Sequence, residues 1–193
     1  MAAASSLELL QTCIQDCQAC PLGAGRLRLV FGEGHPSARM LFIGEGPGRD
    51  EDLQGRPFVG KAGVLLDKMI AAIGTRRQDV YITNIVKCRP PDNRTPTPQE
   101  AQHCLPYLKR QIELLRPAVI VTLGATPLRE LLGVPGGITR LRGQWQRLDL
   151  LGGIPVMPTF HPAYVLRQYT DDVRRAVWED LKAARAWLDQ HPE

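Results

Sequence analysis

The sequence has no apolar run of membrane-spanning length, and it does not begin with a basic segment followed by an apolar one. These absences argue against a membrane protein and against a secretory signal peptide, so we expect a cytoplasmic protein without a membrane partner. Internal repeats, low-complexity tracts and linker-like stretches are missing as well. We therefore expect one domain over residues 1–193, a length that can bury a sizeable core.

Lysine is scarce, with 5 lysines against 19 arginines, and the net charge is +4. A positive charge favours a polyanionic partner, but mild basicity is also typical of an ordinary solvated surface. The arginine excess can reflect phosphate recognition or only genome composition. Charge alone therefore leaves the partner open.

Apolar runs predict strands at 38–44, 80–87, 118–124 and 154–160, and helical patterns predict helices at about 6–17, 62–73, 97–115, 125–132 and 171–188. Strands that alternate with helices favour a three-layer α/β/α sandwich with a central four-stranded parallel sheet. Two prolines place the last strand at an edge. Ser6 and Thr97 are candidate helix caps, and Pro106 predicts a kink or a break in the helix at 97–115.

Three segments with unusual polar residues follow the predicted strands. Glu45 to Phe58 follows the first strand, Asn84 to Cys88 ends the second, and His161 to Arg167 follows the fourth. Ligands of parallel sheets bind outside the carboxyl ends of the strands, so we expect these segments to form one site.

The glycine-rich segment Gly44–Gly48 is not a dinucleotide motif, because Arg49 stands where the third glycine belongs, and no P-loop is present. The segment is either a tight turn or a loop whose N–H groups bind an anion. A lone histidine is more often structural, but the Tyr164–Arg167 segment that follows His161 favours a place in the site. Asn84 is one of two asparagines and lies in a strand, where asparagine is disfavoured; its amide can donate and accept at once, which suits reading a nucleobase edge.

Four cysteines form a candidate metal site: Cys17, Cys20, Cys88 and Cys104. Thiols stay reduced in the cytosol, so metal binding is favoured over disulfides, and both tetrahedral zinc and an iron–sulfur cluster fit four thiolates. Cys13 lies one helical turn before Cys17 and could compete as a ligand, although we expect it to be a small buried helix residue.

Ordered motifs extend over nearly the whole chain and resemble family 4 uracil-DNA glycosylases, the iron–sulfur members of that superfamily. The matching blocks are Cys17–Leu22, Val30–Gly34, Gly44–Gly48 with Glu51 and Asp52, Gly55–Gly63, Tyr81–Pro91, Cys104, Arg142–Gly143 and His161–Arg167.

The resemblance implies a DNA repair enzyme that hydrolyses the N-glycosidic bond of uracil, releases the free base and leaves an abasic site, the first step of base excision repair. It implies a uracil-DNA glycosylase-like fold, uracil-containing DNA (single- or double-stranded) as partner, and a [4Fe–4S] cluster of structural role on Cys17, Cys20, Cys88 and Cys104. Cys13 is left out of this ligand set. We expect a monomer.

The resemblance also assigns uracil contacts after the base has been flipped into a pocket. Phe58 would stack on the base, Asn84 would read N3–H and O4, and His161 would donate to O2. The remaining contacts are Gly44, Glu45 and Gly46 beside O2 and the glycosidic bond, and Glu51 near C5, where it would exclude the methyl group of thymine.

Two catalytic residues follow from these assignments, Glu45 and His161. Better-studied relatives have an aspartate at the position of Gly46, so Glu45 is the candidate for positioning water or stabilising the oxocarbenium-like sugar. The expected DNA contacts are Lys61, Arg89, Tyr164, Val165 and Arg167.

Three alternatives remain. The chain could be a metal-stapled DNA-binding module without activity, or a glycosylase that prefers another deaminated base such as xanthine or hypoxanthine. A third class traps uracil-DNA covalently through a histidine, but it carries an extra basic insertion near Arg89 that this sequence lacks.

Overall fold

The computed structural model of the chain describes residues 4–192, and within them a six-stranded sheet has the order β1-β3-β2-β4-β6-β5. The strands are β1 (Glu33–Gly34), β2 (Met40–Gly44), β3 (Tyr81–Asn84), β4 (Val119–Leu123), β5 (Gln146–Leu148) and β6 (Ile154–Thr159). β3, β2, β4 and β6 are parallel, whereas β1 and β5 pair antiparallel at the two edges.

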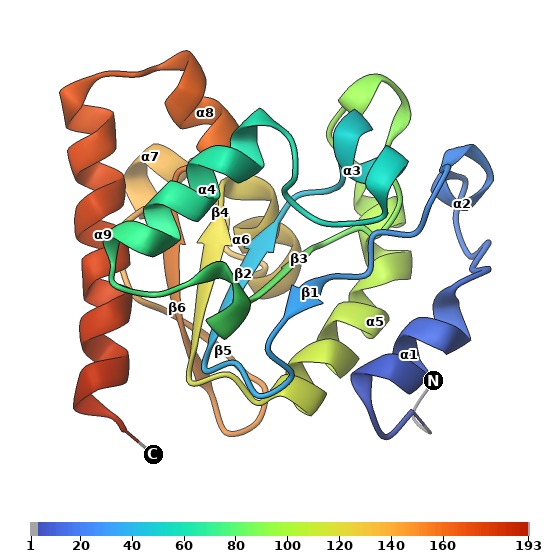
Figure 1. Cartoon of the computed structure of the whole chain (residues 1–193), viewed down its shortest axis with the longest axis horizontal. Coiled ribbons are helices and arrows are strands. Elements are labelled where there is room, and N and C mark those ends of the chain that lie inside the picture. The colour runs from blue at the N-terminus through green and yellow to red at the C-terminus, as the bar shows by residue number, and fades with distance from the viewer. Residues whose placement is uncertain (1–3, 193) are drawn as a thin grey trace.

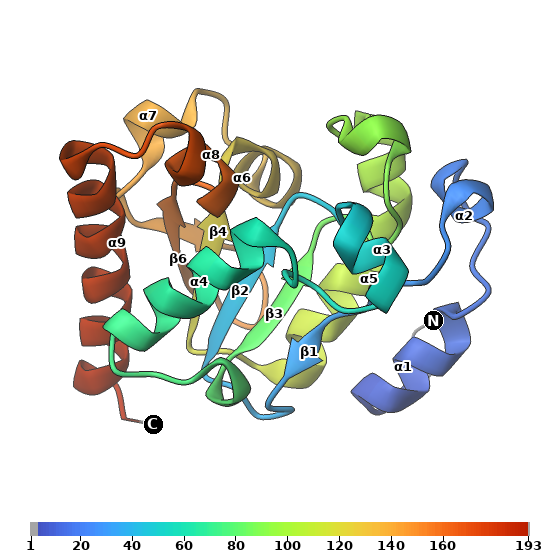
Figure 2. The ribbon, with the colours of Figure 1, turned by 45° about the horizontal axis from the view of Figure 1, so that its top comes forward.

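Helices cover both faces of this sheet (Figures 1 and 2). They are α1 (Leu7–Ile14), α2 (Leu22–Gly25), α3 (Arg49–Gln54), α4 (Lys61–Ala72), α5 (Pro98–Leu115), α6 (Ala125–Leu132), α7 (Ile138–Leu141), α8 (Pro162–Arg167) and α9 (Asp171–Gln190). Two 3-10 turns, η1 (Arg77–Asp79) and η2 (Pro91–Asn93), precede β3 and α5.

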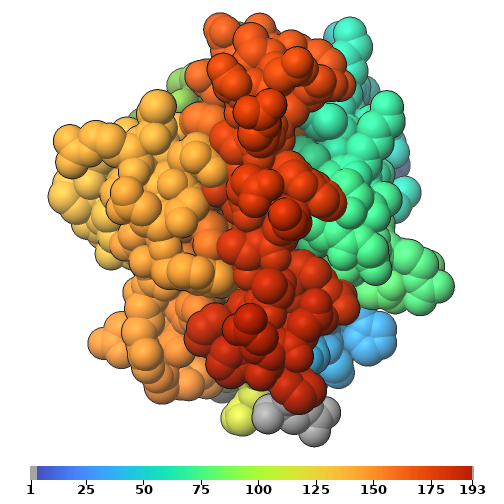
Figure 3. Space-filling model, turned by 90° about the vertical axis from the view of Figure 1, so that its left-hand side faces the viewer, coloured from blue at the N-terminus to red at the C-terminus, as the bar shows by residue number. Residues whose placement is uncertain are grey.

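Alternate residues of β2 pack against opposite helical layers, because successive side chains of a strand point to opposite faces. Met40 and Phe42 pack in the core with α4 and α9, whereas Leu41 and Ile43 pack in the core with α1, α5 and α6. Figure 3 shows α9 lying between α4 and the segment that contains α6 and α7. The predicted three-layer α/β/α class is confirmed.

The four predicted strands are confirmed, but the edge position of the fourth is wrong, because β5 pairs with β6 on its outer side. The pairing covers only residues 154–156, and beyond it the carbonyl of Pro158 accepts a hydrogen bond from the N–H of Gly143. Pro158, which has no N–H to donate, therefore lies beyond the reach of β5. The edge strands β1 and β5 escaped prediction because they have only two and three residues.

α5 continues through Pro106 from Pro98 to Leu115, so the break offered as one alternative is wrong, whereas the kink stays a prediction. A proline in a helix leaves the carbonyl four residues earlier without its N–H partner. Pro106 and Gln102 are both on the exposed side of α5, where water can replace that partner.

Both predicted helix caps are confirmed. The Ser6 hydroxyl accepts a hydrogen bond from the N–H of Leu9 at 3.2 Å. Thr97 and Glu100 form a reciprocal capping box, in which each side chain accepts from the backbone N–H of the other. Arg94 adds a two-bond contact to the Glu100 carboxylate, at 2.7 and 2.8 Å.

We predict an acid-dependent loss of stability at this capping box. The hydrogen bonds from Arg94, together with those at the helix start, lower the pKa of Glu100 from 4.5 to about 2. Because the folded-state pKa is depressed, the stabilisation is complete above pH 4.5 and is lost as the pH falls through about 2. Chemical denaturation of wild type and Glu100→Gln should show their largest difference in unfolding free energy above pH 4.5, and a difference that does not shrink in acid would contradict this account.

Candidate active site

A cleft of about 780 Å³ lies at the carboxyl ends of the parallel strands, and its lining includes residues of α3 and α8, whose positions Figure 1 shows. Each of these strands delivers a lining residue at its end. Glu45 follows β2, Asn84 ends β3, Gly124 follows β4 and His161 follows β6. The three segments expected to form one site therefore do so.

Phe58 contributes an aromatic wall to the cleft. Its ring centroid lies 5.6 Å from that of His161, and its φ of 51° is in the left-handed region that side chains rarely adopt. Two glycines make room for it. A Cβ at Gly63 would lie 1.9 Å from the Phe58 carbonyl oxygen, and a Cβ at Gly44 would lie 2.5 Å from the ring and 2.4 Å from Oδ1 of Asn84. Gly44 is buried and does not line the cleft, so its place is behind the site.

Asn84 lines the cleft and carries a side-chain oxygen without a hydrogen-bond partner. The residue is only 1% exposed, and among the described residues its Oδ1 is one of two buried side-chain atoms without a hydrogen-bond partner, the other being Oγ1 of Thr122. Nearly all buried polar atoms of native proteins are paired, so an unpaired one requires a reason. Asn84 lines the cleft, so a ligand N–H that reaches this amide would supply the missing partner.

The hydrogen bonding of His161 determines where its proton lies. Its Nδ1 accepts the N–H of Ala163 at 3.0 Å, and an accepting Nδ1 leaves the proton of a neutral imidazole on Nε2. Burial, with a smaller contribution from the positive charge of Arg167, lowers the pKa of His161 to about 4. The ring is therefore a neutral Nε2–H donor at neutral pH.

Glu45 is oriented by a residue that the sequence analysis did not identify. The hydroxyl of Thr126 donates to Oε2 of Glu45 at 2.6 Å. Thr126 is 5% exposed and lies in the first turn of α6, so its hydroxyl is held in place by the fold. No sequence motif connects two residues 81 positions apart.

Glu51 lines the cleft, but both of its oxygens are engaged by the backbone. Oε1 accepts the N–H groups of Val59 and Gly60 at 2.9 and 3.0 Å, and Oε2 accepts the N–H of Gly48 at 3.1 Å. The carboxylate thus clamps the segment after β2 to the segment that carries Phe58. This clamp was not anticipated from the sequence.

The expected DNA contacts divide into two groups. Lys61, Tyr164 and Arg167 line the cleft, together with the expected uracil contact Gly46. Arg89 does not line it, although its Nε donates at 2.7 Å to Asn93, which does.

Val165 is a correction to the expected DNA contacts. It is 3% exposed and packs in the core, because the turn of α8 directs it inward, so its side chain has no access to DNA. The next residue, Leu166, is 42% exposed and was missed. Recognising 162–167 as a helix would have indicated that neighbouring residues there point to different sides.

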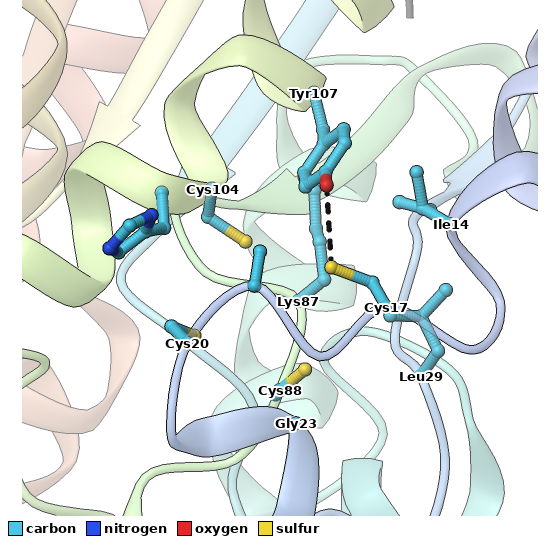
Figure 4. Close-up of a pocket in the computed structure, with 11 residues that line it drawn as sticks. Ile14, Cys17, Cys20, Gly23, Leu29, Lys87, Cys88, Cys104 and Tyr107 are labelled. Carbon is cyan, nitrogen blue, oxygen red and sulfur yellow. Dashed lines mark hydrogen bonds between the residues drawn. The ribbon is translucent and has the colours of Figure 1, made fainter.

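The four predicted cysteines line one small cavity of about 10 Å³ (Figure 4). Cys17 and Cys20 come from the segment between α1 and α2, Cys88 follows β3, and Cys104 lies on α5. All four are free thiols. Cys13 is exposed rather than buried, which corrects that expectation, and it is not among the cavity residues.

Hydrogen bonds to sulfur surround the cysteine cavity. Cys17 Sγ shares one with the Tyr107 hydroxyl at 3.3 Å, and the Arg26 guanidinium donates to Cys88 Sγ at 3.3 Å. Burial raises the pKa of the Cys104 thiol to about 11. Metal binding would therefore have to displace that proton, as is usual for thiol ligands.

Four thiols from three segments are a donor set that fits an iron–sulfur cluster. Within residues 4–192, no three His, Cys, Asp or Glu side chains converge closely enough to hold one metal ion. The two observations are compatible, because each cysteine of a four-iron cluster binds a separate iron.

Lys87 joins the cysteine cavity to the cleft. It lines the cavity, is 1% exposed, and donates from Nζ to Asn84 O at 2.7 Å and to Thr83 Oγ1 at 2.5 Å. Burial lowers the pKa of Lys87 to about 7, opposed by the charges of Cys104 and Cys88.

Of the described helices, none is long and apolar enough to cross a membrane.

Sequence comparisons give consistent matches. The model of the uracil DNA glycosylase superfamily matches residues 31–182. A type-4 uracil-DNA glycosylase of Thermotoga maritima is 49% identical over 183 residues, which cover 94% of each chain. The corresponding protein of Saccharolobus solfataricus is 42% identical over 97% of this chain and 88% of its own. That of Archaeoglobus fulgidus is 44% identical over 88% of this chain and 86% of its own.

We predict that His161 stays neutral across the physiological range. Its folded-state pKa of about 4 lies below the ordinary 6.5, so the stability that this contributes is present above pH 6.5 and lost as the pH falls through about 4. Nitrogen NMR between pH 5 and 8 should show a protonated Nε2 and an unprotonated Nδ1. A titration of His161 centred near 6.5, or a proton on Nδ1, would contradict the assignment.

Proposed function

The chain belongs to the uracil DNA glycosylase superfamily, and we propose that it is a type-4 uracil-DNA glycosylase. It hydrolyses the N-glycosidic bond of uracil in DNA, releases uracil and leaves an abasic site for base excision repair. The observation that carries this proposal is the unpaired Oδ1 of buried Asn84 beside Phe58 and His161 in one cleft.

Base recognition in this proposal combines stacking with hydrogen bonding. The flipped uracil stacks on Phe58, its N3–H donates to Oδ1 of Asn84, and its O4 accepts from the same amide. Cytosine has an acceptor at N3 and a donor at its 4-amino group. It would therefore leave Oδ1 unpaired and place two donors together, which disfavours its binding.

Departure of the base requires stabilisation of the negative charge that develops on uracil O2. The Nε2–H of neutral His161 can donate to this oxygen, and a donor fixed before the reaction contributes about 2.7–4 kcal/mol in comparable oxyanion sites. α4 and α6 begin at the cleft, and the positive ends of their dipoles favour an anion there.

Glu45 acts at the deoxyribose from which the base departs. Its carboxylate positions the attacking water or stabilises the oxocarbenium-like sugar, and the hydroxyl of Thr126 fixes the orientation of the carboxylate. The next residue, Gly46, has no side chain that could take this role. Glu51 fixes the segment around Gly48 against Val59 and Gly60, and its exclusion of the thymine methyl group remains a prediction.

DNA binding would use the rim of the cleft. Lys61, Arg89, Tyr164 and Arg167 supply the phosphate and groove contacts. Leu166, an exposed apolar residue on α8, is suited to fill the space left by the flipped base, since apolar wedges commonly enter between base steps. The substrate can be single- or double-stranded uracil-DNA, and we propose that the protein acts as a monomeric single domain on nucleoid DNA in the cytoplasm.

We further propose that Cys17, Cys20, Cys88 and Cys104 hold a [4Fe–4S] cluster. Such a cluster would tie the segment between α1 and α2 to α5 and to the segment after β3. Its contribution is structural, because it would fix the residues that follow Asn84 in the chain.

The direct test is excision of uracil from an oligonucleotide, followed by alkaline cleavage of abasic sites. Wild type should cut the strand. Glu45→Gln and Asn84→Ala should each lower the single-turnover rate at least about a hundredfold, the usual scale for losing such a group. Glu179→Gln, a change on α9 at a side chain that is 58% exposed, is the matched control and should leave the rate unchanged.

Each other outcome identifies an alternative. An uncut uracil strand that is nevertheless bound would indicate a DNA-binding module, and cutting only of hypoxanthine or xanthine strands would indicate another base preference. A covalently shifted band would indicate a trap. Full activity of Glu45→Gln would remove the role proposed for that carboxylate alone.

The cluster proposal predicts a brown protein with about four irons per chain after purification without oxygen. Cys20→Ser should lose most of the iron, whereas Cys13→Ser, at the exposed cysteine outside the cavity, should retain it. Iron and zinc are measured by elemental analysis. Stoichiometric zinc without iron, or equal iron loss in both variants, would contradict the ligand set.

A further inference from the structure

Phe58 is held in a backbone conformation that is unfavourable for a residue with a side chain. At a φ of 51°, a left-handed conformation costs a non-glycine residue about 1–2 kcal/mol. The surrounding structure must therefore supply contacts that stabilise the segment. Glu51 binds the N–H groups of Val59 and Gly60, which leaves the carbonyls of Pro57 and Phe58 to be fixed by another group.

Arg77 binds both of these carbonyls. Its Nη2 donates to the oxygen of Pro57 at 2.5 Å, and its Nη1 donates to the oxygen of Phe58 at 3.1 Å. Arg77 lies in the 3-10 turn before β3, about twenty residues from Phe58, and it does not line the cleft. Its contact is with the backbone that carries the ring.

Two carboxylates hold the Arg77 guanidinium in place. Nε and Nη2 donate to Glu33 Oε1 at 2.9 and 2.7 Å, and Nη1 donates to Asp67 Oδ1 at 2.7 Å. These bonds and the two carbonyl bonds match the five N–H donors of arginine. The side chain is 21% exposed, so the charge pairs are partly shielded from water.

We infer that Arg77 is a positioning residue for base recognition, because it fixes Phe58 in the left-handed conformation that places its ring against the flipped uracil. The inference rests on the proposed function, in which Phe58 stacks on the base. Arg77 joins β1, through Glu33, and α4, through Asp67, to the Phe58 backbone. The short edge strand β1 thereby acquires a role in the site.

Lysine cannot replace this arginine. A lysine ammonium carries its three N–H donors on one nitrogen. The planar guanidinium of Arg77 instead binds two carboxylates and two carbonyls through three nitrogens. Arg77→Lys retains the charge and loses the geometry. Arg77→Met removes both, with a side chain of similar length.

The chain offers two matched controls. Arg76 is the preceding residue, is 73% exposed and, among residues 4–192, forms its side-chain ion pair only with Asp79. Arg56 also binds Glu33 but is 57% exposed and contacts neither carbonyl. Arg76→Met and Arg56→Met therefore remove an arginine ion pair without touching the Phe58 backbone.

The first measurement is single-turnover excision combined with inhibition by free uracil. Arg77→Met and Arg77→Lys should lower the excision rate and weaken uracil inhibition about ten- to a hundredfold, as expected for losing bonds from a charged donor. Affinity for abasic-site DNA should stay unchanged, because the proposed DNA contacts lie elsewhere. Both control variants should behave as wild type.

A double-mutant cycle with Phe58→Ala separates positioning from general stabilisation. If Arg77 acts through the ring, Arg77→Lys should cause little further loss once Phe58→Ala is present, whereas independent effects would multiply. Multiplying effects, or an Arg77→Lys variant with wild-type rate and uracil inhibition, would overturn the inference.

Amide hydrogen exchange tests the same contact without requiring activity. Exchange at Val59 and Gly60 should accelerate in Arg77→Lys but not in Arg76→Met, while amides of the sheet stay protected. Unchanged or globally accelerated exchange would count against the inference. If the wild-type protein excises no uracil, the proposed function is wrong. Faster amide exchange at Val59 and Gly60 in Arg77→Lys would then still show that Arg77 holds the segment around Phe58.

Discussion

The close approach of three groups at the end of β2 is the constraint around which the site is built. Gly44 stands opposite Asn84 in the parallel register, and Phe58 lies against the same point, so that a single added Cβ would collide with both side chains. The absence of a side chain at Gly44 thereby allows the amide and the aromatic ring to occupy their positions. Glu45 is the next residue in the chain, so its position follows from the same register.

One short segment, residues 84–88, contributes to both the cleft and the cysteine cavity. Asn84 ends β3 and Cys88 follows four residues later, with buried Lys87 between them donating to the backbone oxygen of Asn84. A shift of the cysteines would be transmitted to Asn84, the residue proposed to read the base, through a few covalent bonds and one hydrogen bond. Through this proximity, the proposed cluster would influence the site although it lies outside the cleft.

Local sequence patterns predicted much of this structure, but they did not predict the contacts between residues distant in the chain. Apolar runs located the parallel strands, and Asn84 was recognisable because an asparagine is out of place in a strand. The contact of Thr126 with Glu45 and that of Arg77 with Phe58 join distant residues whose own neighbourhoods look ordinary. Val165 and Cys13 were misassigned because the helical phase around them was not resolved by sequence pattern.

The unpaired Oδ1 of Asn84 has a consequence for how this protein can change over time. A buried acceptor without a partner costs about 1–3 kcal/mol, a substantial fraction of the 5–15 kcal/mol by which domains are stable. An apolar residue of similar size at position 84 would be expected to make the fold more robust while removing the amide. If Asn84 reads the base as proposed, stability and function favour different residues at this position. Selection for thermostability alone would then favour a substitution that removes base recognition.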